Sequence, residues 1–244
     1  MKPIIPIVLL FALSAGVQAQ RIVVGSKRFT ESYVLGEIAK TTLQNAGFAT
    51  EVRPGMGGTI ILWQALQGGE ITLYPEYTGT IAEEILKTKP PLGTDQMSVL
   101  LRQRGVGMTG ELGFNNTYAL VMRRDRAAKL GLHQISDLRD HPDLNIGLTH
   151  EFLDRQDGWT PLSARYGLQM RNVRGIDHAL GYAALANGSI DLKDAYSTDA
   201  RIAENDLVVL DDDLSGTTSC SPSSASRGRC SRRSGRPRTR TATG

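Results

Sequence analysis

The sequence predicts an α/β protein with two lobes. Short β-branched runs alternate with segments of helical spacing, first between residues 21 and 86 and again between residues 118 and 210. Between the two series lie Pro90-Pro91 and a longer connecting stretch, so the alternation restarts after a crossover. Such alternation is typical of parallel sheets with right-handed crossovers, whose ligands lie at the carboxyl ends of the strands. We therefore expect a cleft between two α/β lobes.

In the first series, strands are expected at 21–26, 49–53 and 71–73, and helices at 30–45, from 59 to about 66, and at 78–86. Thr30 and Thr59 stand where each could cap its helix. A helix at 94–104 leads to the second series. There we expect strands at 118–122, 145–148, 193–196 and 207–210, with helices near 126–130, 160–166 and 178–186.

The two ends of the chain differ from its body. Residues 1–19 contain Lys2, an apolar run from Ile4 to Leu13 and small residues up to Ala19, the pattern of a signal peptide cleaved near Ala19. Residues 215–244 hold seven arginines, no acidic residue and both cysteines. Their apolar content is too low for folding, so we expect disorder. We favour a frameshift as its origin over a basic tail that binds anionic surfaces.

The charge distribution and the motifs argue against several function classes. The net charge of +3 comes from the tail, because without it 21 basic residues face 25 acidic ones. No basic patch therefore indicates nucleic-acid binding. The chain lacks a nucleophile elbow and a phosphate-binding loop. His150-Glu151 begins like a zinc-binding helix, but the second histidine is missing. We expect no enzyme, metal or cofactor; an enzyme using His150 and Glu151 on a metal is the weaker alternative.

Aromatic and charged residues near the strand ends suggest a site for a small organic cation. Tyr77, Tyr118 and Tyr196 each fall at a strand end or start. A quaternary ammonium cannot donate hydrogen bonds, so proteins hold it with aromatic faces. Arg155 could bind a carboxylate through two hydrogen bonds, and Lys27 precedes a helix start. Taken alone, each residue is better explained as an ordinary surface or strand residue.

Six motifs in order resemble the glycine betaine/osmoprotectant-binding proteins of ABC importers. They are GSKRFTES, GMGGT, YPEYTGT, LGFNNTYAL, HEFLDRQDG and AYSTDARI, between residues 25 and 202. The resemblance implies a two-lobed type II periplasmic binding fold, with a first lobe at 20–122 and a second at 123–214. It further implies an exported, monomeric periplasmic protein that captures glycine betaine, choline or a related quaternary amine and delivers it to a membrane permease. A sensor for the same compounds is the alternative.

The resemblance also assigns roles to individual residues. Tyr77, Tyr118 and Tyr196 match cage tyrosines, Arg155 and Lys27 match charged ligand contacts, and Thr80 matches a polar contact. Glu76 is a further candidate near the cation, whereas Tyr74 is expected to pack in the core. The expected ligand contacts are therefore Lys27, Tyr77, Thr80, Tyr118, Arg155 and Tyr196.

The chain departs from the family after LVVLDDDL, at residues 207–214. Family members continue with a segment that supplies another cage aromatic and completes the first lobe, and here the arginine-rich tail replaces it. We therefore expect an incomplete first lobe with exposed apolar surface, and weakened or absent ligand binding. A non-functional, frameshifted copy is the corresponding alternative.

Overall fold

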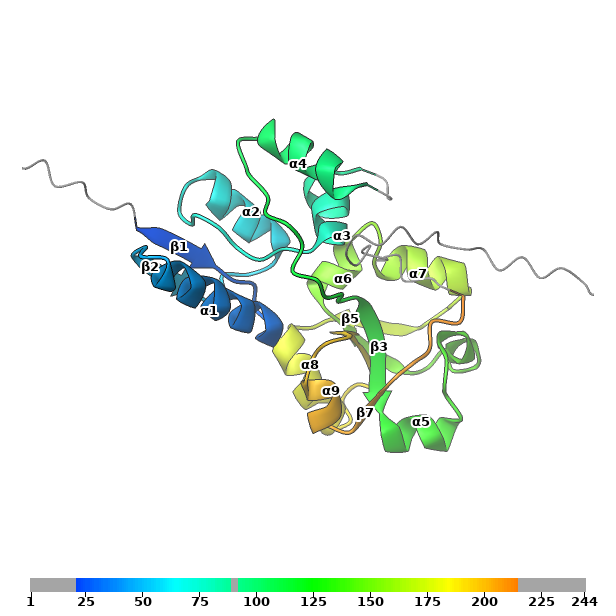
Figure 1. Cartoon of the computed structure of the whole chain (residues 1–244). Coiled ribbons are helices and arrows are strands. Elements are labelled where there is room, and N and C mark those ends of the chain that lie inside the picture. Colours follow the sequence, from blue (N-terminus) through cyan, green and yellow to red (C-terminus); the bar gives the residue numbers. More distant parts are fainter. Residues whose placement is uncertain (1–20, 89–91, 215–244) are drawn as a thin grey trace, which may run out of the picture.

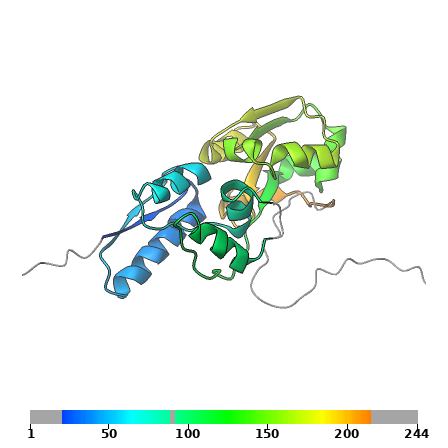
Figure 2. The same ribbon diagram turned by 90° about the horizontal axis from the view of Figure 1, so that it is seen from above.

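The computed structural model describes residues 21–88 and 92–214. Its helices and strands form two groups around separate sheets, which lie side by side in both views (Figures 1 and 2). We call the elements from β1 to α4 the first lobe and those from β3 to β7 the second lobe. The predicted signal peptide and arginine-rich tail lie outside the described residues. Within these residues, no helix has both the length and the hydropathy to cross a membrane.

The first lobe is built on a small parallel sheet. Strand β1 (Ile22–Gly25) pairs with β2 (Thr50–Arg53), and helix α1 (Thr30–Asn45) connects them. The predicted third strand at 71–73 is reduced to a single parallel bridge between Val24 and Leu73. The backbone leaves the sheet directly afterwards at Pro75, which has no amide hydrogen for a further ladder bond. The prediction of a third strand was therefore wrong in extent.

The remaining first-lobe helices follow the predicted order. Helix α2 spans Thr59–Gln67, α3 spans Thr78–Thr80, and a π-helical segment continues from Ile81 to Ile85 before α4 (Thr94–Arg102). The predicted helix at 78–86 thus begins as an α-helical turn and widens into π geometry. Helix α4 packs its buried Met97 and Leu101 on this segment, which gives the lobe a small second core.

The second lobe contains a five-stranded sheet in the order β5-β4-β6-β3-β7. The strands are β3 (Tyr118–Arg123), β4 (Asn145–Leu148), β5 (Asn172–Gly175), β6 (Leu192–Tyr196) and β7 (Leu207–Val209). Strand β4 is parallel to β5 and β6, but β3 is antiparallel to β6 and β7. The prediction of parallel strands was therefore wrong for β3. This strand starts at the end of the sheet where β6 finishes, so the two run in opposite directions.

Helices cover both faces of this second sheet. They are α5 (Arg124–Leu130), the 3-10 helix Ile135–Asp140, α6 (His150–Asp154), α7 (Trp159–Tyr166), α8 (His178–Ala186) and α9 (Arg201–Glu204). Side chains alternate along β3, so that Leu120 and Met122 belong to one core while Ala119 and Val121 belong to the other. Sequence reasoning missed β5, α6, α9 and the 3-10 helix, which are all six residues or shorter.

Exposed apolar side chains concentrate on the first lobe and its connection to the second. Of the twelve large apolar residues that are exposed among residues 21–88 and 92–214, nine lie between residues 33 and 114, which confirms the expectation of apolar surface there. Among the described residues of the second lobe, in contrast, only Leu180, Val209 and Leu214 are large apolar residues with exposed side chains. The nine residues are Tyr33, Val34, Ile38, Phe48, Ile60, Ile61, Val99, Leu112 and Phe114.

Candidate functional site

A small cavity lies between the two lobes, with a volume of about 30 Å³. All six residues predicted from the sequence line it, although they come from both lobes and span 170 positions of the chain. Room for a single water needs roughly 10–15 Å³ measured in this way, so the cavity holds about two waters. A trimethylammonium group therefore requires the lining to move. The lining residues are Lys27, Phe29, Tyr77, Gly79, Thr80, Asn116, Thr117, Tyr118, Glu151, Arg155 and Tyr196.

Aromatic rings form one wall of the cavity. Tyr118 starts β3 and Tyr196 ends β6, and their ring centroids are 5.2 Å apart. Phe29, the residue before α1, lies 4.4 Å from the Tyr196 ring and 6.3 Å from the Tyr77 ring, centroid to centroid. Burial raises the pKa of both Tyr118 and Tyr196 well above the usual value, so these phenols stay neutral. Phe29 was missed by the sequence analysis, although it lies inside the GSKRFTES motif.

Arg155 enters the cavity from the turn after α6 and is 4% exposed. Its Nε and Nη2 donate to the two oxygens of Asp157, each at 2.7 Å, and its Nη1 donates to Thr80 at 3.1 Å. Burial alone would lower the pKa of Arg155, but the bonds to Asp157 and the nearby charges outweigh it and raise the pKa. The guanidinium therefore stays charged, with one edge fixed by Asp157 and the other directed at the cavity.

Lys27 is paired within the chain. Its Nζ donates to Glu76 Oε1 at 2.7 Å and to Thr59 Oγ1 at 2.9 Å, and it lies 4.0 Å from Glu151. Burial raises the pKa of Glu76, and Lys27 opposes that change. The carboxylate predicted to lie near a bound cation therefore binds the chain's own lysine.

The predicted helix caps are not formed. Phe29 and Gly58 occupy the cap positions of α1 and α2, and neither helix has a side-chain cap. Thr30 and Thr59 are instead the first helical residues. The Thr59 hydroxyl accepts from Lys27 and donates to Glu151 Oε1 at 2.6 Å, and both of these partners line the cavity. The hydroxyl that would otherwise cap the helix is therefore hydrogen-bonded to Lys27 and to Glu151 of the opposite lobe.

Polar contacts join the two lobes around the cavity. Thr59 of α2 binds Glu151 of α6, and Thr80 of α3 binds Arg155. A third contact joins Glu31 of α1 to Thr198, which follows β6. These bonds hold the lobes against each other and enclose the aromatic wall.

A histidine and an aspartate support the aromatic wall from the second lobe. The His178 ring is 5.1 Å from the Tyr196 ring, and its Nε2 lies 3.0 Å from Asp199 Oδ2. Tyr182 donates to the same oxygen at 2.7 Å. Burial alone would raise the pKa of Asp199, but the hydrogen bonds from His178 and Tyr182 outweigh it and lower the pKa to about 2. His178 therefore packs behind Tyr196 at the start of α8.

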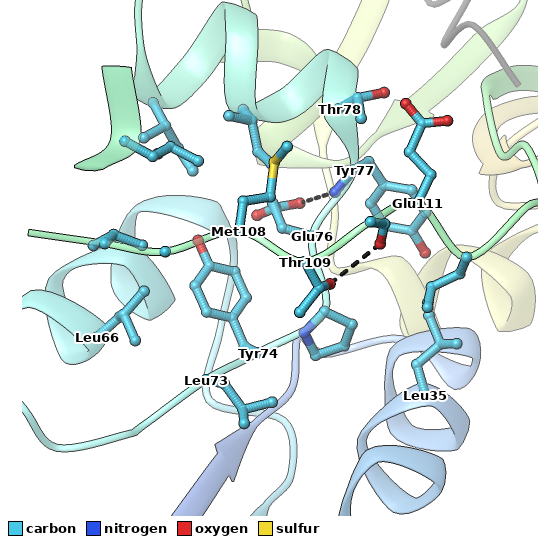
Figure 3. Close-up of a pocket in the computed structure, with 18 of the residues that line it drawn as sticks. Leu35, Leu66, Leu73, Tyr74, Glu76, Tyr77, Thr78, Met108, Thr109 and Glu111 are labelled. Atoms are coloured by element: carbon cyan, nitrogen blue, oxygen red, sulfur yellow. Dashed lines mark hydrogen bonds between the residues drawn. The ribbon is translucent and has the colours of Figure 1, made fainter. Parts of the chain in front are cut away.

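A larger cavity of about 310 Å³ lies next to this one, between the first lobe and the connection to the second (Figure 3). Tyr77 and Asn116 line both cavities, and Glu76 lines the larger one, where its Oε1 accepts from the Tyr77 backbone at 2.9 Å. Its walls are mainly apolar, including Leu35, Leu66, Leu73, Tyr74 and Met108, and no arginine or lysine among the described residues lines it. We therefore assign the candidate ligand site to the smaller cavity, where aromatic rings and Arg155 meet.

Comparison with known proteins places the chain in a family. Residues 20–223 match the model of the substrate-binding domain of ABC-type glycine betaine transport systems. A glycine-betaine-binding protein of Pseudomonas aeruginosa is 34% identical over 212 residues, covering 80% of this chain and 68% of the relative. The carnitine transport binding protein OpuCC of Listeria monocytogenes is 29% identical over 199 residues, covering 78% of this chain and 65% of the relative. The chain spans 36% of the ergothioneine transport permease/ergothioneine binding protein EgtU of Helicobacter pylori, which is 33% identical over 202 residues and covers 81% of this chain.

Solved structures show the same fold. The crystal structure of a glycine betaine/carnitine/choline ABC transporter aligns with a TM-score of 0.58 at 27% identity, over 79% of this chain and 74% of that chain. The apo form of YehZ from Escherichia coli aligns with a TM-score of 0.54 at 27% identity, over 82% and 77%. These matches confirm the predicted type II periplasmic binding fold. The chain belongs to the substrate-binding domain family of ABC-type glycine betaine transport systems.

Proposed function

We propose that this chain binds a small quaternary-ammonium compound such as glycine betaine, choline or carnitine and delivers it to the permease of an ABC importer. One observation carries the proposal: Tyr77, Tyr118 and Tyr196 line the same inter-lobe cavity as Arg155. Aromatic faces attract a cation that cannot donate hydrogen bonds, and a guanidinium attracts a carboxylate. Lys27 and Thr80 line the same cavity and complete the set of proposed ligand contacts.

The geometry supports capture by closure of the two lobes. The cavity is too small for a trimethylammonium group unless its lining moves, and the Thr59–Glu151 and Thr80–Arg155 bonds cross between the lobes. Opening these contacts would admit the ligand, and closing them around it would bury it. No catalytic step is part of this proposal. The protein would act as a monomer in the periplasm.

The relatives favour transport over sensing. The Pseudomonas and Listeria relatives are named as binding proteins for glycine betaine and for carnitine transport, and a more distant one, CosB of Halobacterium salinarum, is named for chemotactic signalling at 28% identity. The same ligand chemistry serves both roles. Transport would be supported if the ATPase activity of the importer is stimulated only by the ligand-bound form of this protein.

The binding proposal is tested by isothermal titration of the purified chain with glycine betaine, choline and 3,3-dimethyl-1-butanol. The last compound has the shape of choline without the charge. Each aromatic ring contributes about 0.5–2 kcal/mol to binding of a cation, so titrations should extend to millimolar concentrations. We expect both quaternary amines to bind with weakened affinity, because the tail replaces the segment after residue 214, and the neutral compound not to bind. Equal binding of the neutral compound, or no binding of either amine, would contradict the proposal.

A further inference from the structure

Glu31, a residue that the sequence analysis did not single out, receives hydrogen bonds from three separate segments. It is the second residue of α1. The Tyr77 hydroxyl and Asn116 Nδ2 donate to its Oε1, the latter at 2.9 Å, and the Thr198 hydroxyl donates to its Oε2. One carboxylate thus joins an aromatic residue of the cavity, the connection between the lobes and the second lobe.

The position of Glu31 suits a fixed anion. It lies in the first turn of a 16-residue helix, where the helix dipole favours a negative side chain. Its three partners lie 46, 85 and 167 residues away in the sequence, so only the folded chain assembles them. Thr198 follows Tyr196 by two residues. Glu31 therefore connects the segments that carry two of the proposed cage tyrosines.

The bond from Tyr77 to Glu31 affects the aromatic ring in two ways. A hydroxyl held by a carboxylate fixes the direction of the ring more firmly than a hydroxyl that faces water, because charge-assisted hydrogen bonds are about twice as strong. Donation to an anion also leaves more electron density on the ring, which strengthens its attraction for a cation. Burial and the Glu31 bond together raise the pKa of Tyr77, so the hydroxyl keeps the proton that it donates.

We propose that Glu31 is a positioning residue that orients the Tyr77 ring toward a bound quaternary ammonium and links it, through Thr198, to the segment that carries Tyr196. The proposal rests on the function proposed above. Glu31 is absent from the residues that line the cavity, so it acts through Tyr77. It serves the cation end of the ligand and has no contact with Arg155.

The test measures binding of tetramethylammonium, which has no carboxylate, and of glycine betaine to four proteins: the unaltered chain, Glu31→Gln, Tyr77→Phe and the double variant. We expect Glu31→Gln to weaken binding of both ligands by the same factor, about tenfold. In the Tyr77→Phe background the Glu31→Gln effect should fall below about twofold, because the hydroxyl that responds to Glu31 is gone. Glu37→Gln is the matched control, since Glu37 lies on the same helix, is 58% exposed and pairs only with Lys40 among the described residues.

Several outcomes would overturn the proposal. If Glu31→Gln lowers the melting temperature but leaves both affinities unchanged, Glu31 is structural only. An equal effect of Glu31→Gln with and without the Tyr77 hydroxyl would show that it does not act through Tyr77. Tyr77→Phe alone gives a separate test should Glu31→Gln not fold, because unweakened binding by that variant would show that the ring needs no positioning. If the unaltered chain binds neither amine, the proposed function fails as well; binding that is insensitive to Glu31 overturns this proposal alone.

Discussion

Tyr118 and Tyr196 are register partners across the antiparallel pair β3 and β6, and their ring centroids lie 5.2 Å apart. Directly opposed residues of adjacent strands place their side chains on the same face of a sheet. The two rings are therefore held by backbone pairing. A site built on strand register is more rigid than one built on loops, which leaves Tyr77 of the first lobe as the ring that changes position when the lobes move.

Replacing Tyr196 by leucine should weaken binding of tetramethylammonium by about fivefold to thirtyfold, since one aromatic face contributes about 1–2 kcal/mol in a desolvated site. Tyr196→Phe keeps the ring and should bind within about threefold of the unaltered chain. Titration calorimetry measures both. Tyr33→Leu serves as the control, because Tyr33 is an exposed tyrosine of α1. Unchanged affinity in Tyr196→Leu would remove Tyr196 from the cage.

Replacing Asp157 by asparagine should separate the two ends of a zwitterionic ligand. Asp157 holds Nε and Nη2 of Arg155, so its loss frees the guanidinium to turn away from the cavity. We expect the affinity for glycine betaine to fall by about tenfold or more, and the affinity for choline by less than about threefold, because choline has no carboxylate. Titration of both ligands gives the ratio. Asp143→Asn, in an exposed pair with Arg171, is the control.

Equal losses for the two ligands in Asp157→Asn would show that Arg155 does not contact a ligand carboxylate. The pair is nearly buried, with side chains 3% and 8% exposed, so a lower melting temperature is expected in any case. Only the ratio of the two affinities bears on the proposed clamp.

Local sequence patterns predicted most elements of the fold. They failed where the extent or direction of a strand depends on segments far away in the sequence. The helix at 30–45 and the strand at 145–148 have the predicted bounds, because periodicity and turn residues are local signals. The extent of the strand at 71–73 and the direction of β3 depend on neighbours far along the chain. No pattern within residues 118–122 indicates which way the adjacent strand runs.

The candidate site shows the same division. The six residues named from motifs line one cavity, but Asp157, which binds Arg155, and Glu31, which binds Tyr77, were missed. Asp157 was within the HEFLDRQDG motif and could have been found as a partner for Arg155 two residues earlier. Glu31 could not, because its donors lie up to 167 residues away. The Thr59 hydroxyl was assigned to a cap because sequence alone did not show Lys27 and Glu151 beside it.

Asp199 should make stability depend on pH in the acid range. Its pKa is lowered from 3.8 to about 2 in the folded chain, so the folded state prefers the charged form. The stabilisation is present above the unfolded pKa and is lost as the pH falls through the folded one. About 1 kcal/mol should disappear between pH 5 and pH 3. Urea unfolding at both values measures it.

Asp199→Asn should lose correspondingly less unfolding free energy over that range than the unaltered chain. Asp143→Asn is a matched control at an exposed position, with a side chain that is 73% exposed. A pH dependence of Asp199→Asn equal to that of the unaltered chain would show that His178 and Tyr182 do not hold this carboxylate in its charged form.

Removing the Thr59 hydroxyl should shift the lobes toward an open arrangement. Thr59 donates to Glu151 on the opposite lobe, and a hydrogen bond to a charged group contributes about 1.5–3 kcal/mol. Because the cavity must open to admit a ligand, the lobes must already separate at times, and Thr59→Val should make that more frequent. Small-angle scattering should show a larger radius of gyration for ligand-free Thr59→Val than for Thr41→Val, an exposed control on α1. Saturating glycine betaine should restore the compact form, and identical scattering from the two variants without ligand would mean that this contact does not hold the lobes closed.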